Sequence, residues 1–236
     1  MNKNGFLAAM FSRLFQILLY SVVFLSTLYA APTTMPLDGK KIISALEKSY
    51  GSRAAKRGKA WVKLIKQSTA KNELERLTQV NQFFNMFHFI DDIKLWGVKN
   101  YWATPVEFIG VNGGDCEDYS IAKYFTLLEL GISDNKMKIT MVKARQLNQY
   151  HMVLAYYETP SAIPLILDNI NGLIKPATQR NDLVPIYSFN GSQLWLNKEK
   201  GRGVLSGHSS RLKRWQDLRQ RIHTSTLKQP KLKLEF

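Results

Sequence analysis

The first half of the chain places its apolar residues at helical spacing. This pattern covers residues 37–50, 54–65 and 72–95, where apolar residues recur three and four positions apart. A fourth helix is expected over residues 116–130, because Gly131 provides a natural helix stop. Aromatic and aliphatic residues form a stripe along residues 72–95, and we expect that stripe to lie in the core.

After Gly131 the pattern changes from helical spacing to strand-like runs. Strands are expected over residues 138–143, 150–157, 163–168, 184–189 and 193–196. Turn residues separate them, at Pro160, Asn171-Gly172 and Asn190-Gly191. Helices in the first part and strands in the second predict an α+β domain.

The first thirty residues have the pattern of a secretory signal peptide. Lys3 and Arg13 give a positive start, residues 14–28 are almost wholly apolar, and small residues follow at Ala30 and Ala31. The apolar run is shorter than the roughly 20 residues that a spanning helix needs, and an uncleaved N-terminal anchor is the alternative. We therefore expect residues 1–30 to direct export.

The formal net charge of +15 is unevenly distributed. Residues 198–236 carry eleven Lys or Arg and three Asp or Glu, a net charge of +8. Such a segment suits an anionic membrane surface or nucleic acid, but the export signal and the lack of a recognised motif argue against nucleic acid. We expect a solvated basic helix over residues 211–222, then a loose end. The expected organisation is a signal peptide (1–30), one domain (31–197) and a basic C-terminal helix and tail (198–236).

Cys116 is the single cysteine of the chain, so an exported protein of this sequence has no internal disulfide. The thiol is either buried and inert or kept free for chemistry. It stands in Gly113-Gly114-Asp115-Cys116-Glu117-Asp118, at the start of an expected helix. A helix N-terminus lowers a thiol pKa and offers the Cys116 N–H to an oxyanion, and the glycines let the backbone turn sharply.

Two residues on expected strands complete a candidate nucleophilic site. His151 is the second residue of the 150–157 pattern, whereas the other histidines fall in the basic tail or in the 72–95 helix. Asp168 ends the 163–168 strand, where it can orient a histidine on a neighbouring strand. Taken singly, His151 fits an ordinary strand histidine and Asp168 a turn residue. Together with Cys116 they predict a Cys–His–Asp site.

Several segments resemble the bacterial transglutaminase-like cysteine proteinase family, and in particular its LapG-type members. The resemblance is dense between residues 96 and 195 and loose in the upstream helices. It rests on residues 101–108, 113–124, 151–154, 167–169 and 187–190. The resemblance implies a papain-like/transglutaminase-like fold, with a helical N-terminal part packed on an antiparallel sheet. It also implies a catalytic triad of Cys116, His151 and Asp168.

The resemblance further implies a biological setting. LapG-type proteases are periplasmic and cut giant surface adhesins near their N-termini, after a pair of alanines, and so release cells from biofilm. An inner-membrane receptor that senses cyclic di-GMP sequesters them, and calcium is needed for their activity. The expected partners are therefore an adhesin substrate and such a receptor, and the expected cofactor is Ca²⁺.

Three carboxylates, Asp115, Glu117 and Asp118, cluster about the thiol. They raise the pKa of Cys116, and a bound Ca²⁺, which takes oxygen ligands, would cancel that effect. The alternative is helix capping, with Asp115 as N-cap and Asp118 at N3. The resemblance favours calcium for Asp115 and Glu117, with Asp118 as a third candidate ligand. Trp102, in an aromatic loop before the site, is expected either to contact substrate or partner or to pack on the helix of Cys116.

The predicted activity is that of a cysteine endopeptidase, with Cys116 as nucleophile, His151 as proton carrier and Asp168 as its orienting group. A transglutaminase-type acyl transferase would use the same triad, because the two reactions diverge only when water or an amine attacks the thioester. A non-catalytic receptor-binding module, with Cys116 as a buried thiol, is the alternative from another class.

Overall fold

The computed structural model describes residues 38–197, 203–222 and 226–233, all within one compact unit that spans Pro36–Phe236. The expected signal peptide, residues 1–30, lies outside the described residues. None of the described helices combines the length and the apolar character of a membrane-spanning segment.

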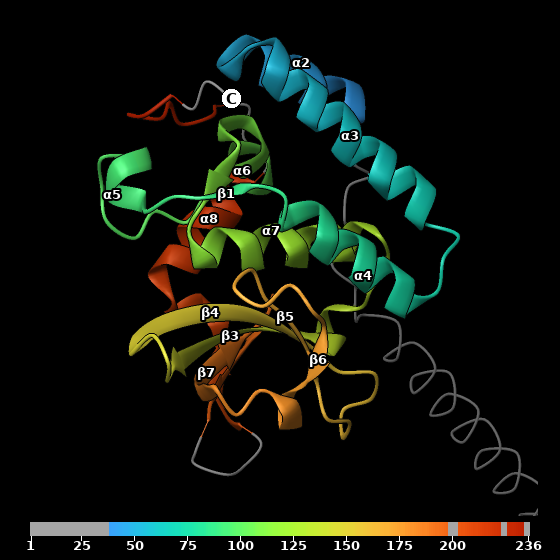
Figure 1. The fold of residues 1–236 in the computed structure, drawn as a ribbon, viewed down its shortest axis with the longest axis vertical. Helices are drawn as coiled ribbons and strands as arrows, with labels where there is room; N and C mark the ends of the chain where they lie inside the picture. Colours follow the sequence, from blue (N-terminus) through green and yellow to red (C-terminus); the bar gives the residue numbers. More distant parts are fainter. Residues whose placement is uncertain (1–37, 198–202, 223–225, 234–236) are drawn as a thin grey trace, which may run out of the picture. The chain divides into compact units, whose positions relative to one another are not determined.

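The helices of the first part are α2 (Gly39–Tyr50), α3 (Ser52–Ser68), α4 (Glu73–Phe84), α5 (Asp92–Leu95), α6 (Pro105–Val111) and α7 (Cys116–Glu129) (Figure 1). A capping box formed by Asn72 and Glu75 begins α4. Another, formed by Thr104 and Glu107, begins α6, with Pro105 at the first helical position. The predicted positions of α2, α3 and α7 are confirmed, whereas the apolar pattern does not predict α6.

The single helix expected over residues 72–95 is wrong. α4 ends at Phe84, β1 (His88–Phe89) then pairs in parallel with β2 (Gly113–Gly114), and α5 follows. At His88 and Phe89, pairing with β2 replaces helical hydrogen bonds. The consequence for the site is that Asp92, instead of lying on a long helix, comes close to the start of α7.

The larger sheet of the described residues has seven strands in the order β6-β5-β4-β3-β7-β8-β9, and every neighbouring pair is antiparallel. All five expected strands are present, and β6 and β9 join them. The expected α+β class, with helices packed on an antiparallel sheet, is confirmed. The strands are β3 (Met137–Ala144), β4 (Gln149–Tyr156), β5 (Leu165–Leu167), β6 (Lys175–Pro176), β7 (Leu183–Phe189), β8 (Gln193–Leu196) and β9 (Val204–His208).

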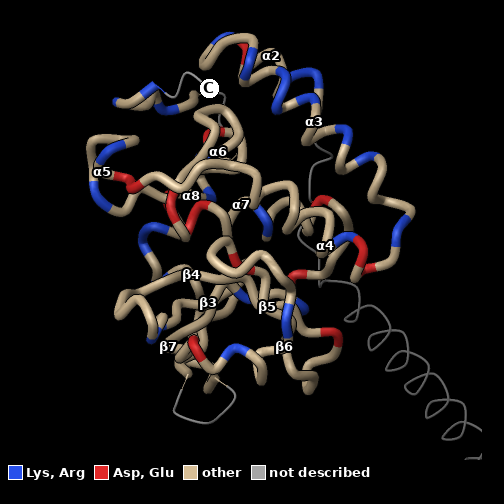
Figure 2. The backbone as a smooth tube through the Cα atoms, viewed as in Figure 1, with Lys and Arg blue, Asp and Glu red and all other residues tan. Residues whose placement is uncertain are grey.

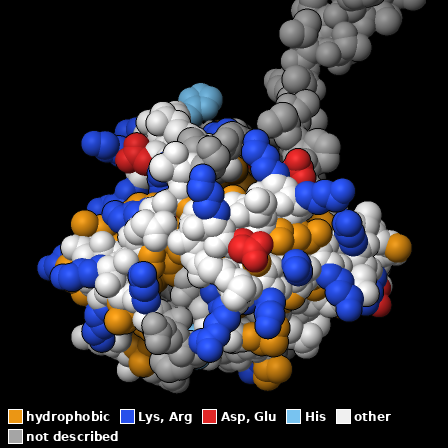
Figure 3. All heavy atoms as spheres, turned by 90° about the horizontal axis from the view of Figure 1, so that it is seen from above, with side chains coloured by type: hydrophobic (Ala, Val, Ile, Leu, Met, Phe, Trp, Pro, Cys, Tyr) orange, Lys and Arg blue, Asp and Glu red, His pale blue; other side chains and the backbone are white. Residues whose placement is uncertain are grey.

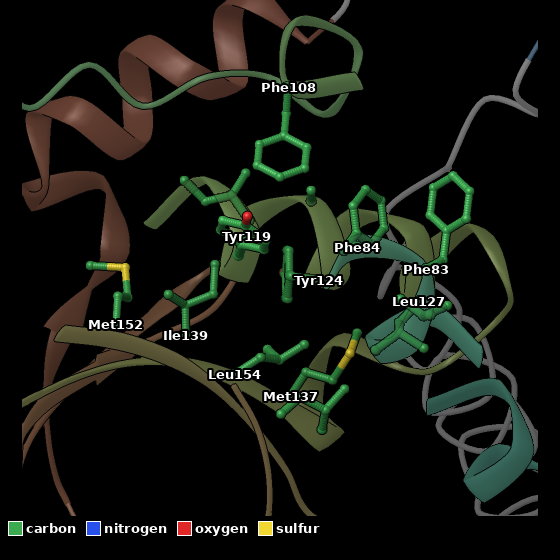
Figure 4. Packing of buried hydrophobic residues seen from close by; sticks show 14 of the residues in the cluster. Phe83, Phe84, Phe108, Tyr119, Tyr124, Leu127, Met137, Ile139, Met152 and Leu154 are labelled. Atoms are coloured by element: carbon green, nitrogen blue, oxygen red, sulfur yellow. The ribbon is translucent and has the colours of Figure 1, made fainter. Parts of the chain in front are cut away.

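α7 lies between the other helices and the sheet. It packs against α4 and α6 on one side and against β4 and β3 on the other. Figure 4 shows Phe108 on the helical side of Tyr119 and Tyr124, with Leu154 on the sheet side. A helix that is buried on both sides holds its first residue, Cys116, at a defined position over the sheet.

β9 and α8 (Lys213–Arg221), which follow the boundary expected after residue 197, lie in the same compact unit as the rest. β9 pairs with β8 and so extends the sheet. Within α8, Trp215 and Leu218 are buried, and the Trp215 ring lies against Phe189 with ring centroids 5.1 Å apart. This apolar pair at i and i+3 gives the basic helix a buried face, so it is not solvated all round as expected.

Candidate active site

One residue, Asp115, separates Cys116 from the short strand β2. The packing here is so close that a Cβ atom on Gly113 would lie 2.2 Å from the His88 carbonyl oxygen, and one on Gly114 would lie 2.3 Å from Asp118 Oδ2. Close approach, rather than the sharp turn expected, is what requires glycine at these two positions. The pairing of β2 with β1 fixes the direction in which the chain enters α7.

The Cys116 thiol is half-buried and lies among acidic groups. Its Sγ donates a hydrogen bond to Glu117 Oε2 at 3.1 Å, and the backbone N–H of Met152 on β4 donates to the sulfur. Burial raises the pKa of the Cys116 thiol well above its usual value, and the carboxylates of Glu117 and Asp115 raise it further. These effects on the pKa of Cys116 outweigh the lowering that a helix N-terminus alone would cause.

His151 and Asp168 form a buried pair, and His151 directly precedes Met152, whose N–H donates to the thiol. Since β4 and β5 are antiparallel neighbours and Asp168 directly follows β5, its carboxylate reaches the imidazole, with Oδ1 2.7 Å from His151 Nε2. With Nε2–H donating to Asp168, Nδ1 is the nitrogen that can exchange a proton with Cys116. Ser120 on α7 donates to the Met152 carbonyl at 3.0 Å, which ties the helix to the strand beside His151. The structure thus pairs His151 with Asp168 and connects the neighbouring Met152 to the first residue and the second turn of α7.

Asp168 has a second basic partner, Arg180, that no sequence pattern indicates. Arg180 Nη2 donates to Asp168 Oδ2 at 2.7 Å and to Asp182 Oδ2 at 2.8 Å, and the guanidinium is almost completely buried. Burial alone would raise the pKa of Asp168, but hydrogen bonds from His151, the Ile170 N–H and Arg180, with the charge of His151, lower it below its ordinary value. Arg180 thus keeps Asp168 ionised and directs its other oxygen to His151.

An acidic cluster lies beside the thiol. Ligand atoms of Asp92, Asp115 and Asp118 lie within 4.8 Å of one another, and so do those of Asp115, Cys116 and Glu117. Asp92 and Asp115 each have one buried oxygen, Oδ1, without a hydrogen-bond partner among the described residues. Burial and the charge of Glu117 raise the pKa of Asp92 to about 7. Burial and the charges of Asp118 and Glu117 raise that of Asp115 to about 11.

Neighbouring buried carboxylates cannot all stay charged unless protons or a cation neutralise them, and oxygen ligands of this kind suit Ca²⁺. Both oxygens of Asp118 already accept backbone hydrogen bonds, from Ala103 at 2.7 Å and from Asp115 at 3.3 Å, in keeping with the capping alternative. Asp115 Oδ1 has no hydrogen-bond partner among the described residues and can therefore bind a cation. Asp92, which sequence reasoning missed because its segment was assigned to a helix, contributes another such oxygen.

Trp102 is not the exposed anchor that binding to substrate or partner would require. Its side chain is 7% exposed and stacks on Phe189, with ring centroids 5.7 Å apart and an interplanar angle of 11°. Its carbonyl accepts a hydrogen bond from Arg221 on α8. Trp102 therefore packs on β7, rather than on the helix of Cys116 as its packing alternative expected, and its binding role stays a prediction.

A thiol at a helix N-terminus, set beside a strand histidine that a buried aspartate holds, is the arrangement of papain-like and transglutaminase-like cysteine hydrolases. The chain belongs to the bacterial transglutaminase-like cysteine proteinase family (BTLCP), whose model matches residues 50–203. The predicted family and fold are thereby confirmed.

Among solved structures, the chain is similar to LapG of Legionella pneumophila. The EGTA-treated form is 40% identical, with 79% of this chain and 98% of that chain covered and a TM-score of 0.71. The calcium-bound form is 41% identical, with 79% and 100% covered and a TM-score of 0.69. The comparison with curated proteins found no match.

Replacing Arg180 by Gln should destabilise the fold and make it more sensitive to acid. Breaking a buried ion pair from one side costs about 3–5 kcal/mol of the free energy of unfolding. A carboxylate with a lowered pKa stabilises the fold above its unfolded-state pKa and loses that contribution as the pH falls through its folded-state pKa. Because the folded-state pKa of Asp168 rises in Arg180→Gln, acid unfolding should begin at a higher pH. Urea unfolding at a series of pH values measures both effects.

The matched control is Asp182→Asn, at the more exposed end of the same chain of contacts. We expect this change to cost about 1 kcal/mol or less, because a partly exposed ion pair contributes little. Equal losses of stability in the two variants would contradict the role of Arg180 in holding Asp168.

Proposed function

We propose that the protein is an exported cysteine endopeptidase in which Cys116, His151 and Asp168 form the catalytic triad. The observation that carries this proposal is the buried His151–Asp168 pair, 2.7 Å apart, together with a thiol at the first residue of α7 that accepts a hydrogen bond from the N–H of the residue after His151. Membership of a cysteine proteinase family supports hydrolysis of a peptide bond as the reaction.

In the proposed mechanism, His151 Nδ1 takes the thiol proton and Cys116 attacks the scissile carbonyl as a thiolate. Asp168 stabilises the imidazolium that forms, because Arg180 keeps its carboxylate charged. The Cys116 N–H stabilises the oxyanion, since N–H groups in the first turn of a helix have no acceptor within the helix. The imidazolium protonates the leaving amine. His151 then deprotonates a water molecule, which hydrolyses the thioester.

We propose Ca²⁺ as the cofactor, held by Asp115, Glu117 and Asp92, with Asp118 closing the loop around it. The unpaired buried oxygens of Asp92 and Asp115 support this assignment, as does the calcium-bound form of LapG. When bound, the ion supplies the positive charge that these carboxylates otherwise lack. The thiolate of Cys116 then has neutralised neighbours, so the thiol loses its proton at a lower pH.

The family resemblance supports a specific setting for this activity. We propose that the enzyme works in the periplasm and cleaves a large surface adhesin near its N-terminus, at a di-alanine site, to release cells from biofilm. We also propose that an inner-membrane cyclic di-GMP receptor regulates it by sequestration. The similarity to LapG over nearly the whole of that chain supports both assignments.

Cleavage of the N-terminal region of a large adhesin-like protein, with calcium or with excess EGTA, tests the proposed function. Wild-type protein should cleave in calcium and stop in EGTA. Cys116→Ala and His151→Ala should each lower the rate by at least about 10³-fold, because a triad acts as a unit. His208→Ala, at an exposed histidine on β9, is the matched control and should cleave like wild type. Appreciable cleavage by folded Cys116→Ala would refute the assignment of the nucleophile.

Asp92→Asn should weaken calcium binding by at least about tenfold, because a charged ligand becomes a neutral amide. Asp91→Asn is the matched control, since the neighbouring Asp91 is exposed and pairs with Lys94 at 3.2 Å. Isothermal titration calorimetry measures the calcium affinity independently of cleavage. Equal affinities in the two variants would exclude Asp92 from the calcium site.

A further inference from the structure

The outer sides of α2 and α3 form a densely cationic surface, here called the basic face. Residues 39–68 contain nine Lys or Arg and one acidic residue, Glu47. Figure 2 shows cations along both helices, and Figure 3 looks onto this side of the molecule, where Lys and Arg side chains predominate among the charged groups. The exposed cations of the basic face are Lys40, Lys41, Lys48, Arg53, Lys56, Lys59, Lys63 and Lys66.

Helical spacing separates these cations from the core. Lys56, Lys59, Lys63 and Lys66 follow at intervals of three, four and three residues, which places them along one side of α3. The opposite side of the helix buries Trp61. Among the described residues, every ion pair lies outside α2 and α3, so acidic groups do not compensate this charge locally.

Arg57, the ninth cation of α2 and α3, differs from the others because its side chain stabilises the fold. Its guanidinium turns inward and donates to the carbonyls of Ile109 and Gly110 at 2.7 and 2.6 Å, which ties α3 to α6. The exposed cations of the basic face have no such inward contacts among the described residues, so maintaining the fold does not explain their number.

A surface cleft of about 470 Å³ opens on the basic face, between α2 and the segment that follows α8. Its lining includes Lys41, Lys48, Ser44, Ser49 and Thr226. Ammonium and hydroxyl groups are hydrogen-bond donors that suit phosphate oxygens. The basic face therefore combines an extended positive charge with a recess of matching chemistry.

We propose that the basic face binds the anionic phosphates of a phospholipid bilayer. Each Lys or Arg near an anionic leaflet strengthens the attraction, and the attraction fades within a Debye length. A row of cations along two adjacent helices meets these conditions. α6 and α7 lie between the basic face and the sheet (Figure 1), so a bilayer there leaves the Cys116–His151 pair uncovered. This binding does not depend on the cleavage reaction.

Vesicle co-sedimentation tests the proposal, with the chain from residue 36 onward because that part is a compact unit by itself. It should bind vesicles of phosphatidylcholine with about 30% phosphatidylglycerol at about 50 mM salt, and release them at about 500 mM. A face variant combines Lys56→Gln, Lys59→Gln, Lys63→Gln and Lys66→Gln. The matched control removes the same charge at exposed positions elsewhere, by Lys94→Gln, Lys99→Gln, Arg145→Gln and Lys213→Gln.

We expect the face variant to lose roughly a thousandfold in vesicle affinity and the control to stay within about threefold of wild type. Cys116→Ala should bind vesicles like wild type. Equal losses in the face variant and the control would show that net charge alone attracts the vesicles, and would overturn the proposal. So would the absence of wild-type binding, or binding through the basic face to duplex DNA but not to vesicles.

Discussion

The concentration of buried carboxyl groups around one thiol is the constraint that shapes this site. Asp92, Asp115, Glu117 and Asp118 come from two separate segments and converge beside Cys116. Such groups cannot share a poorly solvated space as anions without protons or a cation to neutralise them. These carboxylates also affect the Cys116 thiol, because they raise its pKa as long as they are charged. A cation would therefore organise the loop and activate the nucleophile together.

At Asp168 the balance of charge is reversed. Arg180 and His151 surround Asp168 and lower its pKa, whereas the acidic cluster raises the pKa of Asp115 to about 11. The pKa of one carboxyl group is lowered and that of another is raised, which indicates that the two groups have different tasks. One holds an imidazole in the tautomer and orientation that proton transfer needs. The other suits a hard cation. Neither arrangement requires α7 to move, because that helix is buried between the other helices and the sheet.

Sequence patterns located Cys116, His151 and Asp168 because each marks the start or end of a regular element, or sits within a strand whose partner is adjacent. Asp92 and Arg180 were not found, because their roles depend on contacts between distant segments that no local period encodes. The burial of Trp102 and Trp215 could not be predicted for the same reason. A local pattern does not distinguish an aromatic ring that is exposed for binding from one that packs in the core. The sequence directs attention to the charge of the C-terminal segment, yet the structure also shows an exposed basic surface on α2 and α3.

The pH dependence of Cys116 alkylation by iodoacetamide, in calcium and in EGTA, tests the link between the acidic cluster and the nucleophile most directly. Only the thiolate reacts well, so the midpoint of the profile reports the pKa of the thiol. We expect a midpoint well above the ordinary thiol value in EGTA, and a midpoint lower by at least about one pH unit in calcium. Identical profiles under the two conditions would contradict a calcium-dependent nucleophile.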